Sequence, residues 1–185
     1  MKAVLILIFS LLALSTVNGQ ECIKSVKNMA KLNITRFATG RWYVYKSSLL
    51  YGQFGASCVY GAFKNGTSGR FTVNYVVLNV KRSDVIPYNK NQLGFDVNLS
   101  VPVPILNFNI NVTAKAVVVA TDYDNYCVIY GCGNFGFMSV SELLIISRKN
   151  YTLDANSTST VNSILTSNGL DKITLKTSPS SKCQN

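Results

Sequence analysis

Apolar and polar residues alternate along much of the chain between residues 41 and 147, with the two-residue period of a β-strand. The alternation is cleanest in two neighbouring segments, where a Gly, Asp or Asn separates each apolar residue from the next. Because successive side chains of a strand point to opposite faces, each segment has one apolar and one polar face. The apolar residues of these two faces are Phe95, Val97, Leu99, Phe108, Ile110 and Val112.

The same pattern predicts eight strands, at residues 39–47, 57–63, 70–80, 93–99, 106–112, 116–120, 126–132 and 137–147. Residues 51–55 and 64–69 are rich in glycine, so we expect loops there. Residues 81–91 are polar and contain Pro87, and we interpret them as a connection between strands.

Helical spacing follows the last long strand. Val161, Ile164 and Leu165 predict a helix, and Asn168-Gly169 supplies a stop signal. Ser and Thr dominate this segment and have low helix propensity. We therefore expect the helix to depend on docking its apolar stripe against the rest of the fold.

Two short elements are expected nearer the ends of the chain. Val26, Met29 and Ala30 recur at helical spacing and predict a short helix or turn before the first strand. Ile173 and Leu175 predict a short last strand. Eight strands with hairpin-sized connections and one late helix favour an all-β protein: an eight-stranded antiparallel up-and-down barrel with one C-terminal α-helix packed outside. Such a barrel encloses side chains or one small ligand.

Residues 1–19 have the pattern of a secretory signal peptide. Lys2 provides a positive start, residues 4–14 are a nearly unbroken apolar run, and residues 17–19 place small residues at a cleavage site. The run is shorter than the roughly 20 residues that a membrane span needs. We expect residues 20–185 to form a single domain that is secreted and extracellular.

Six Asn-x-Ser/Thr triplets fit a secreted glycoprotein. They begin at Asn33, Asn65, Asn98, Asn111, Asn150 and Asn156. If Asn98 and Asn111 carry glycans, they face solvent, and the apolar residues alternating with them face inward. The six apolar residues of the two clearest segments are therefore the predicted lining of a ligand site. Glu142 is a candidate for a polar group that fixes a ligand's orientation.

The chain is strongly basic, with 18 Lys+Arg against 8 Asp+Glu, and its net charge is +9 once Lys2 is removed. Such an excess attracts anionic partners such as fatty acids, sulfated glycans, a membrane surface or a receptor. A merely solvated basic surface is the alternative, because adjacent basic residues occur only at 81–82 and 148–149. No basic stripe is present, so we expect no nucleic-acid partner. We expect a monomer or weak dimer.

The five cysteines are Cys22, Cys58, Cys127, Cys132 and Cys183. In an oxidising compartment four of them are expected to form two disulfides, and four cysteines allow three pairings. The chain has no His and no Cys-x-x-Cys, which argues against zinc. Acidic residues scattered singly argue against a calcium cage. We expect neither a metal nor a cofactor.

Three motifs occur in order along the chain. The first is Gly40-Arg41-Trp42-Tyr43, which contains the only Trp of the chain. The second is Thr121-Asp122-Tyr123, and the third is Arg148. They resemble the first, second and third motifs of secreted lipocalins of the apolipoprotein D and insect lipocalin branch. The likeness spans essentially the whole secreted chain, and residues 130–132 and 164–168 resemble apolipoprotein D in particular.

The resemblance implies several contacts. Arg148 is expected to stack on Trp42 at the closed end of the barrel. Cys22 is expected to pair with Cys132 and Cys58 with Cys183, which leaves Cys127 over. Cys127 is then a buried free thiol, an intermolecular disulfide partner or, least of all, a catalytic thiol.

The resemblance also implies binding of a small hydrophobic ligand of the lipid, fatty acid, retinoid, sterol or bilin class, which the protein carries or sequesters. The alternative is a protein-interaction lipocalin, acting in adhesion, signalling or as a salivary inhibitor through its open-end loops. Catalysis is disfavoured, since a chain without His lacks the commonest general base. We therefore expect a binding protein and not an enzyme.

Overall fold

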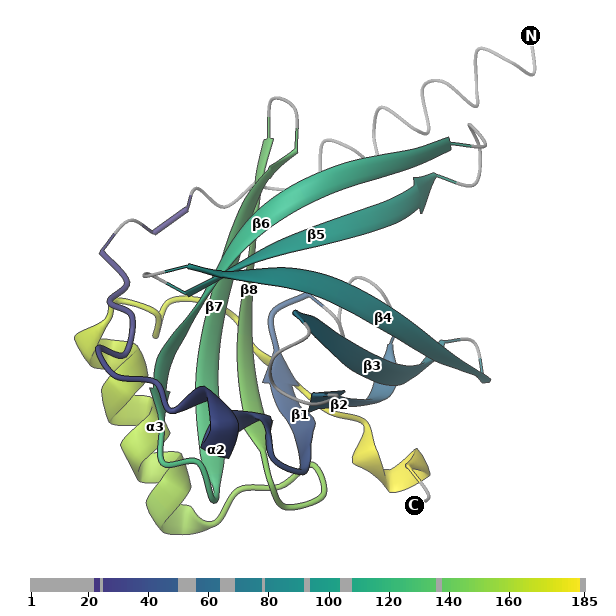
Figure 1. Cartoon of the computed structure of the whole chain (residues 1–185). Coiled ribbons are helices and arrows are strands. Elements are labelled where there is room, and N and C mark those ends of the chain that lie inside the picture. Colours follow the sequence, from purple (N-terminus) through teal and green to yellow (C-terminus); the bar gives the residue numbers. More distant parts are fainter. Residues whose placement is uncertain are drawn as a thin grey trace, which may run out of the picture.

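A computed structural model describes residues 22–23, 25–49, 56–63, 69–77, 79–91, 94–103, 108–135 and 138–183. Long antiparallel strands curl around one another, with a helix against the outside (Figure 1). The strands are β1 (Arg41–Ser47), β2 (Ser57–Phe63), β3 (Arg70–Val77), β4 (Val80–Asn91), β5 (Gly94–Val103), β6 (Phe108–Thr121), β7 (Tyr126–Phe135), β8 (Met138–Ser147) and β9 (Lys176–Thr177). The predicted loop at 51–55 lies outside the described residues, as do residues 64–68 of the loop predicted at 64–69.

Each of the strands β2 to β7 pairs with the next one along the chain, and all these pairs are antiparallel. β8 pairs with β1, and β1 pairs with β2, so the ring of strands is closed. β9 adds to β1 beyond the ring. The up-and-down barrel of eight strands is therefore confirmed. Closure gives every barrel strand a partner on both sides.

The interpretation of residues 81–91 as a connection is wrong, because they belong to β4. The side chains from Val80 to Val85 are exposed, so this part of the strand has no buried face to produce alternation. Pro87 pairs with Arg70 at the end of the β3 ladder, and pairing with β5 begins only at Tyr88. Its missing N–H therefore falls where the ladder changes partners, a place that tolerates proline.

The separate strands predicted at 106–112 and 116–120 are a single strand, β6. Thr113 and Lys115 are exposed, while Ala114 and Ala116 are partly buried, so the alternation continues through the joint. The predicted number of barrel strands is still right, because one strand was missed and another was divided into two.

The short helix lies later than Val26, Met29 and Ala30 predict. In the described part of the N-terminal segment, the first helix is α2 (Ile34–Ala38), and the Asn33 side chain caps it by accepting a hydrogen bond from the Arg36 amide. The segment before it straps the barrel instead, with the Met29 N–H donating to the Val118 carbonyl over 2.8 Å.

The C-terminal helix α3 (Ala155–Ser167) forms where it is expected. The Asp154 carboxylate accepts a hydrogen bond from the Ser157 N–H, and Gly169 ends the helix with a positive φ of 67°. The last strand lies one residue beyond the predicted Leu175, because Ile173 is instead buried against the barrel. A 3-10 turn, η1 (Ser180–Lys182), follows β9.

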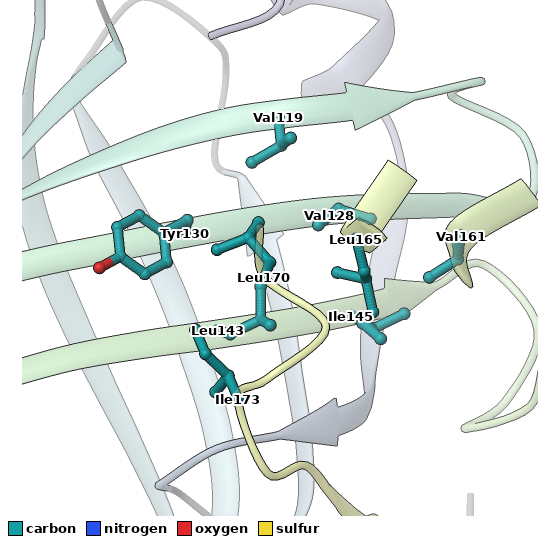
Figure 2. Packing of buried hydrophobic residues seen from close by; sticks show 9 residues of the cluster. All are labelled: Val119, Val128, Tyr130, Leu143, Ile145, Val161, Leu165, Leu170 and Ile173. Atoms are coloured by element: carbon teal, nitrogen blue, oxygen red, sulfur yellow. The ribbon is translucent and has the colours of Figure 1, made fainter. Parts of the chain in front are cut away.

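Helix α3 covers the outer face of β7 and β8 through a continuous apolar layer (Figure 2). We call its buried members the outer cluster: Val119, Val128, Tyr130, Leu143, Ile145, Val161, Leu165, Leu170 and Ile173. A second layer lies on the other face of the same strands. We call its buried members the inner cluster: Phe37, Trp42, Val44, Ala56, Val59, Val118, Cys127 and Ile146.

Two disulfides tie the ends of the chain to the barrel. Cys22 is bonded to Cys132 on β7, and Cys58 on β2 is bonded to Cys183. These are the pairs that the resemblance implies. Cys127 is free and fully buried.

The docking of α3 is testable at adjacent positions. Leu165→Ala removes a side chain that is 6% exposed in the outer cluster, and we expect it to lower the free energy of unfolding by about 2–4 kcal/mol. Thr166→Ala is the control, because Thr166 is exposed and Ala favours a helix. Urea denaturation should show no loss for the control. Equal losses for both variants would contradict a helix held mainly by docking.

Candidate functional site

The register of β7 and β8 separates the inside of the barrel from the outside. On β8, Leu143 and Ile145 belong to the outer cluster, while Ile146 belongs to the inner cluster and Leu144 packs against it. Since side chains alternate, Glu142 lies on the inner face with Leu144 and Ile146. The inner cluster around Trp42 fills the end of the barrel where β1 begins, and we call this the closed end. The end where β1 finishes is the open end.

Arg148 seals the closed end. Its guanidinium carbon lies 3.6 Å from the centroid of the Trp42 ring, which is the stacking expected from the resemblance. Its Nε donates to the Tyr123 carbonyl over 3.0 Å and its Nη1 to the Arg41 carbonyl over 3.0 Å. Its Nη2 donates to the carbonyls of Arg36 and Phe37 over 3.3 and 3.1 Å. One side chain thus joins α2, β1 and the β6–β7 turn.

Trp42 is the central member of this arrangement. It is 2% exposed, and its indole N–H donates to the Phe37 carbonyl over 2.8 Å. The Phe37 ring lies 5.5 Å from the Trp42 ring, centroid to centroid. The polar edge of the indole is therefore satisfied while both of its faces are covered, one of them by Arg148.

The turn between β6 and β7 is built by Asp122. One carboxylate oxygen accepts hydrogen bonds from the amides of Asp124, Asn125 and Tyr126, and the other accepts one from the Asn125 side chain. Partial burial alone would raise the pKa of Asp122, but these hydrogen bonds lower it. The turn holds Tyr123 at a positive φ of 71° and so aims its carbonyl at Arg148.

The predicted ligand-lining residues lie on strands β5 and β6. Phe95 packs against the inner cluster, and Val97 is 9% exposed. Leu99 pairs with Val112, two residues beyond Val97 along the ladder. Ile110 and Phe108 follow at alternate positions of β6. The side chains of these last four residues lie outside the described part of the structure. A ligand-lining role for all six stays a prediction.

Glu142 places a carboxyl group on the otherwise apolar inner face. Its Oε1 accepts hydrogen bonds from the Ser47 hydroxyl over 2.9 Å and the Ser48 amide over 3.1 Å, and its Oε2 accepts one from the Leu49 amide over 3.1 Å. Burial is the largest influence and raises the pKa of Glu142 to about 7, against the opposing effect of these donors. The carboxyl group also anchors the end of β1 at the open end.

Small residues surround Glu142 on the neighbouring strands. Gly131 is its partner on β7, and Ala116 on β6 is the next residue in that row. A Cβ added at Gly131 would approach no atom closer than 3.9 Å, so an alanine there would make only ordinary van der Waals contacts. At Gly133 a Cβ would lie 3.0 Å from the Ala114 Cβ, so that row is tightly packed. Sequence reasoning missed these glycines because their role depends on cross-strand register.

Cys127 and the acidic residues show no arrangement typical of a reactive or metal site. Burial raises the pKa of the Cys127 thiol far above its usual range, so it stays protonated inside the inner cluster. Within the described ranges, no three Cys, Asp or Glu side chains converge to hold a metal ion. Nor does any described helix have the length and hydropathy needed to cross a bilayer.

Three of the predicted glycosylation sites lie on exposed surface: Asn33, Asn150 and Asn156. Asn98 is opposite Thr113 in the register, and Thr113 is exposed. The side chains of Asn98 and Asn111, and Asn65 as a whole, lie outside the described residues. Their glycosylation stays a prediction.

The seal at the closed end predicts that Arg148→Lys is costly. Lys lacks the planar fork that stacks on Trp42 and donates to four carbonyls, so the free energy of unfolding should fall by about 2–4 kcal/mol. Arg41→Lys is the matched control, since exposed Arg41 only stacks over Tyr60. If thermal melts show the same midpoint for Arg148→Lys and the parent, the seal contributes nothing measurable.

The environment of Glu142 predicts a pH-dependent stability. Its pKa is raised from 4.5 in the unfolded chain to about 7, so its contribution is complete below about pH 4.5 and is lost as the pH rises through about 7. Relative to Glu142→Gln, the parent should lose up to about 3 kcal/mol between pH 4.5 and pH 8 in urea denaturation. The comparison isolates Glu142, because both proteins share every other titrating group. Parallel stability curves would contradict the raised pKa.

Comparison with known proteins agrees with this geometry. The sequence model of the family described as Triabin matches residues 16–161. Apolipoprotein D of Mus musculus is 27% identical, over 78% of this chain and 75% of that protein. Insecticyanin from the tobacco hornworm Manduca sexta superposes with a TM-score of 0.64 at 20% identity, over 83% of both chains.

A variant of LTBP1, solved in complex with leukotriene C4, superposes with a TM-score of 0.60 at 21% identity, over 88% of this chain and 96% of that one. At such low identity the solved structures show that the fold is shared. The match to the family model covers most of the chain and contains the motifs of Trp42 and Thr121. The chain therefore belongs to the Triabin family, and it is a lipocalin.

Proposed function

We propose that the protein is a secreted glycoprotein that binds a small hydrophobic ligand inside the barrel, toward its open end, and carries or sequesters it. The observation that carries this proposal is that the residues of the inner face change in kind between the closed end and the open end. Around Trp42 the interior is filled by the inner cluster, whereas nearer the open end it has Gly131 and Glu142. An apolar wall with a few placed polar groups is typical of small-molecule sites.

The polar groups near Glu142 give the site a means of orienting a ligand. The Glu142 carboxyl group is held by Ser47 and two backbone amides, so its position is fixed before a ligand arrives. Phe95 and Val97 supply apolar surface from the neighbouring part of the barrel, on β5. Related barrels support binding of this kind, since LTBP1 was solved with leukotriene C4. The ligand classes that we propose are lipids, fatty acids, retinoids, sterols and bilins.

The sequence supports secretion. The apolar N-terminal run has the form of a signal peptide, and two disulfides require an oxidising compartment. Exposed Asn33, Asn150 and Asn156 are open to glycosylation.

Binding without catalysis fits the available chemistry. The chain has no His, and the only free thiol, Cys127, is buried and held protonated. A nucleophile needs a nearby base or a lowered pKa. The inner face has neither around Cys127, so we propose a carrier and not an enzyme.

The proposal predicts a co-purifying ligand that depends on the space beside Gly131. Native mass spectrometry of protein secreted from eukaryotic cells should detect a bound organic molecule. Gly131→Phe should abolish that adduct, because its ring would extend from the inner face into the barrel beside Glu142, where we place the ligand. Gly131→Ala is the control and should retain the ligand, since its Cβ meets only ordinary contacts at 3.9 Å or more. Circular dichroism checks that both variants fold.

A protein that carries no molecule would overturn the proposal if fatty acids, retinoids, sterols and bilins also failed to bind. Retention of the ligand by folded Gly131→Phe would place the ligand elsewhere.

A further inference from the structure

A groove of about 710 Å³ lies on the outside of the barrel at its closed end. It is separated from the proposed ligand site by the inner cluster around Trp42, and its use is independent of that ligand. α2, β1, the β6–β7 turn and Arg148 form its walls. Its lining residues are Arg36, Thr39, Gly40, Arg41, Tyr43, Tyr123, Asp124 and Arg148. We call it the closed-end groove.

Each of the three arginines in the groove is stacked on an aromatic ring. The guanidinium carbon of Arg36 lies 4.8 Å from the centre of the Tyr123 ring, and that of Arg41 lies 5.1 Å from the Tyr60 ring. Arg148 lies 3.6 Å from the Trp42 ring. Stacking restricts the long side chains, so less conformational entropy is lost when they bind a partner.

The charges in the groove are not balanced. Asp124 is the one acidic lining residue, and it forms an ion pair with Arg36. The hydrogen bonds of Arg148 go to four neutral carbonyls, and Asp124 is the acidic lining residue near it. Arg41 is exposed and forms no ion pair with any described residue. Three arginines against one aspartate leave the lining with an excess of two positive charges.

The backbone leaves Arg148 accessible from the groove. Gly40 has a positive φ of 71°, which by itself favours glycine. A Cβ at this position would also lie 3.5 Å from Arg148 Nη1, on the side facing the groove. The absence of a side chain at Gly40 lets an anion approach the guanidinium over the backbone.

We propose that the closed-end groove binds a sulfated glycan chain, with sulfate groups on Arg41 and Arg148 and sugar rings along Tyr43. Guanidinium groups match the geometry of tetrahedral oxyanions and donate paired hydrogen bonds to them, as exposed Arg41 can. Arg148 has given four of its five N–H groups to carbonyls, so it contributes its charge and one remaining Nη1 N–H. The lining has no aliphatic side chain that would anchor a lipid or an apolar peptide residue. A chain with repeated sulfates engages both arginines at once, and the net charge of +9 of the secreted chain favours its approach.

The test uses a heparin octasaccharide and titration calorimetry at about 0.15 M salt, where surface attraction is largely screened. The parent protein should bind it saturably. Arg41→Gln should weaken binding about tenfold, because it removes the exposed guanidinium group that has no ion-pair partner among the described residues. Lys81→Gln is the matched control. It removes the same charge from an exposed position on β4, outside the groove, and should leave the affinity nearly unchanged.

Four results would overturn the proposal. The octasaccharide could fail to bind, or both variants could weaken binding equally, which would indicate attraction by net charge alone. The desulfated octasaccharide could bind as well as the sulfated one. A glutamate octapeptide or phosphatidylserine vesicles could bind more tightly, which would assign the groove to an acidic protein or a membrane. None of these results bears on the ligand inside the barrel, which the Gly131 variants test separately.

Discussion

Arg148 joins three segments that are far apart in the sequence. Its guanidinium covers Trp42 and donates to carbonyls of α2, β1 and the β6–β7 turn. Those carbonyls lie where the barrel ends and strand pairing can no longer satisfy them, so a side chain has to do so. The Arg148 cation covers this end of the barrel, and no additional chain segment is needed to cover it. The closed end is therefore both sealed and positively charged. Arg148 thus seals the inside of the barrel and also lines the groove on the outside.

The strands β7 and β8 contribute side chains to both the outer and the inner cluster. Val128 and Leu143 pack outward under α3, while Cys127 and Ile146 pack inward around Trp42. Most positions on these strands are therefore apolar, above all on the inner face. Glu142 is the exception on the inner face, and three hydrogen bonds hold it there. A carboxyl group in such a place costs stability when ionised, and groups of this kind are candidates for functional sites.

The predictable parts of the structure are those where at least one face is buried. β1, β7 and β8 begin and end within two or three residues of the predicted limits, and α3 follows its spacing of Val161 and Leu165. β4 was missed because the side chains from Val80 to Val85 are exposed and give no period. The position of Trp42 opposite Arg148 came from resemblance and not from any local pattern. Glu142 was a candidate, but its facing and its partners Ser47 and Leu49 depend on tertiary contacts that no local pattern contains.

The two disulfides overlap along the chain, since one links residues 22 and 132 and the other links 58 and 183. Every peptide bond between Cys22 and Cys183 thus lies within at least one covalent loop. A single proteolytic cut anywhere in that span leaves the two pieces joined through sulfur. The cut protein keeps its mass, apart from one added water, and each end of the break stays beside the strand it came from. In a medium rich in proteases, the barrel can therefore be nicked once without losing any part of itself.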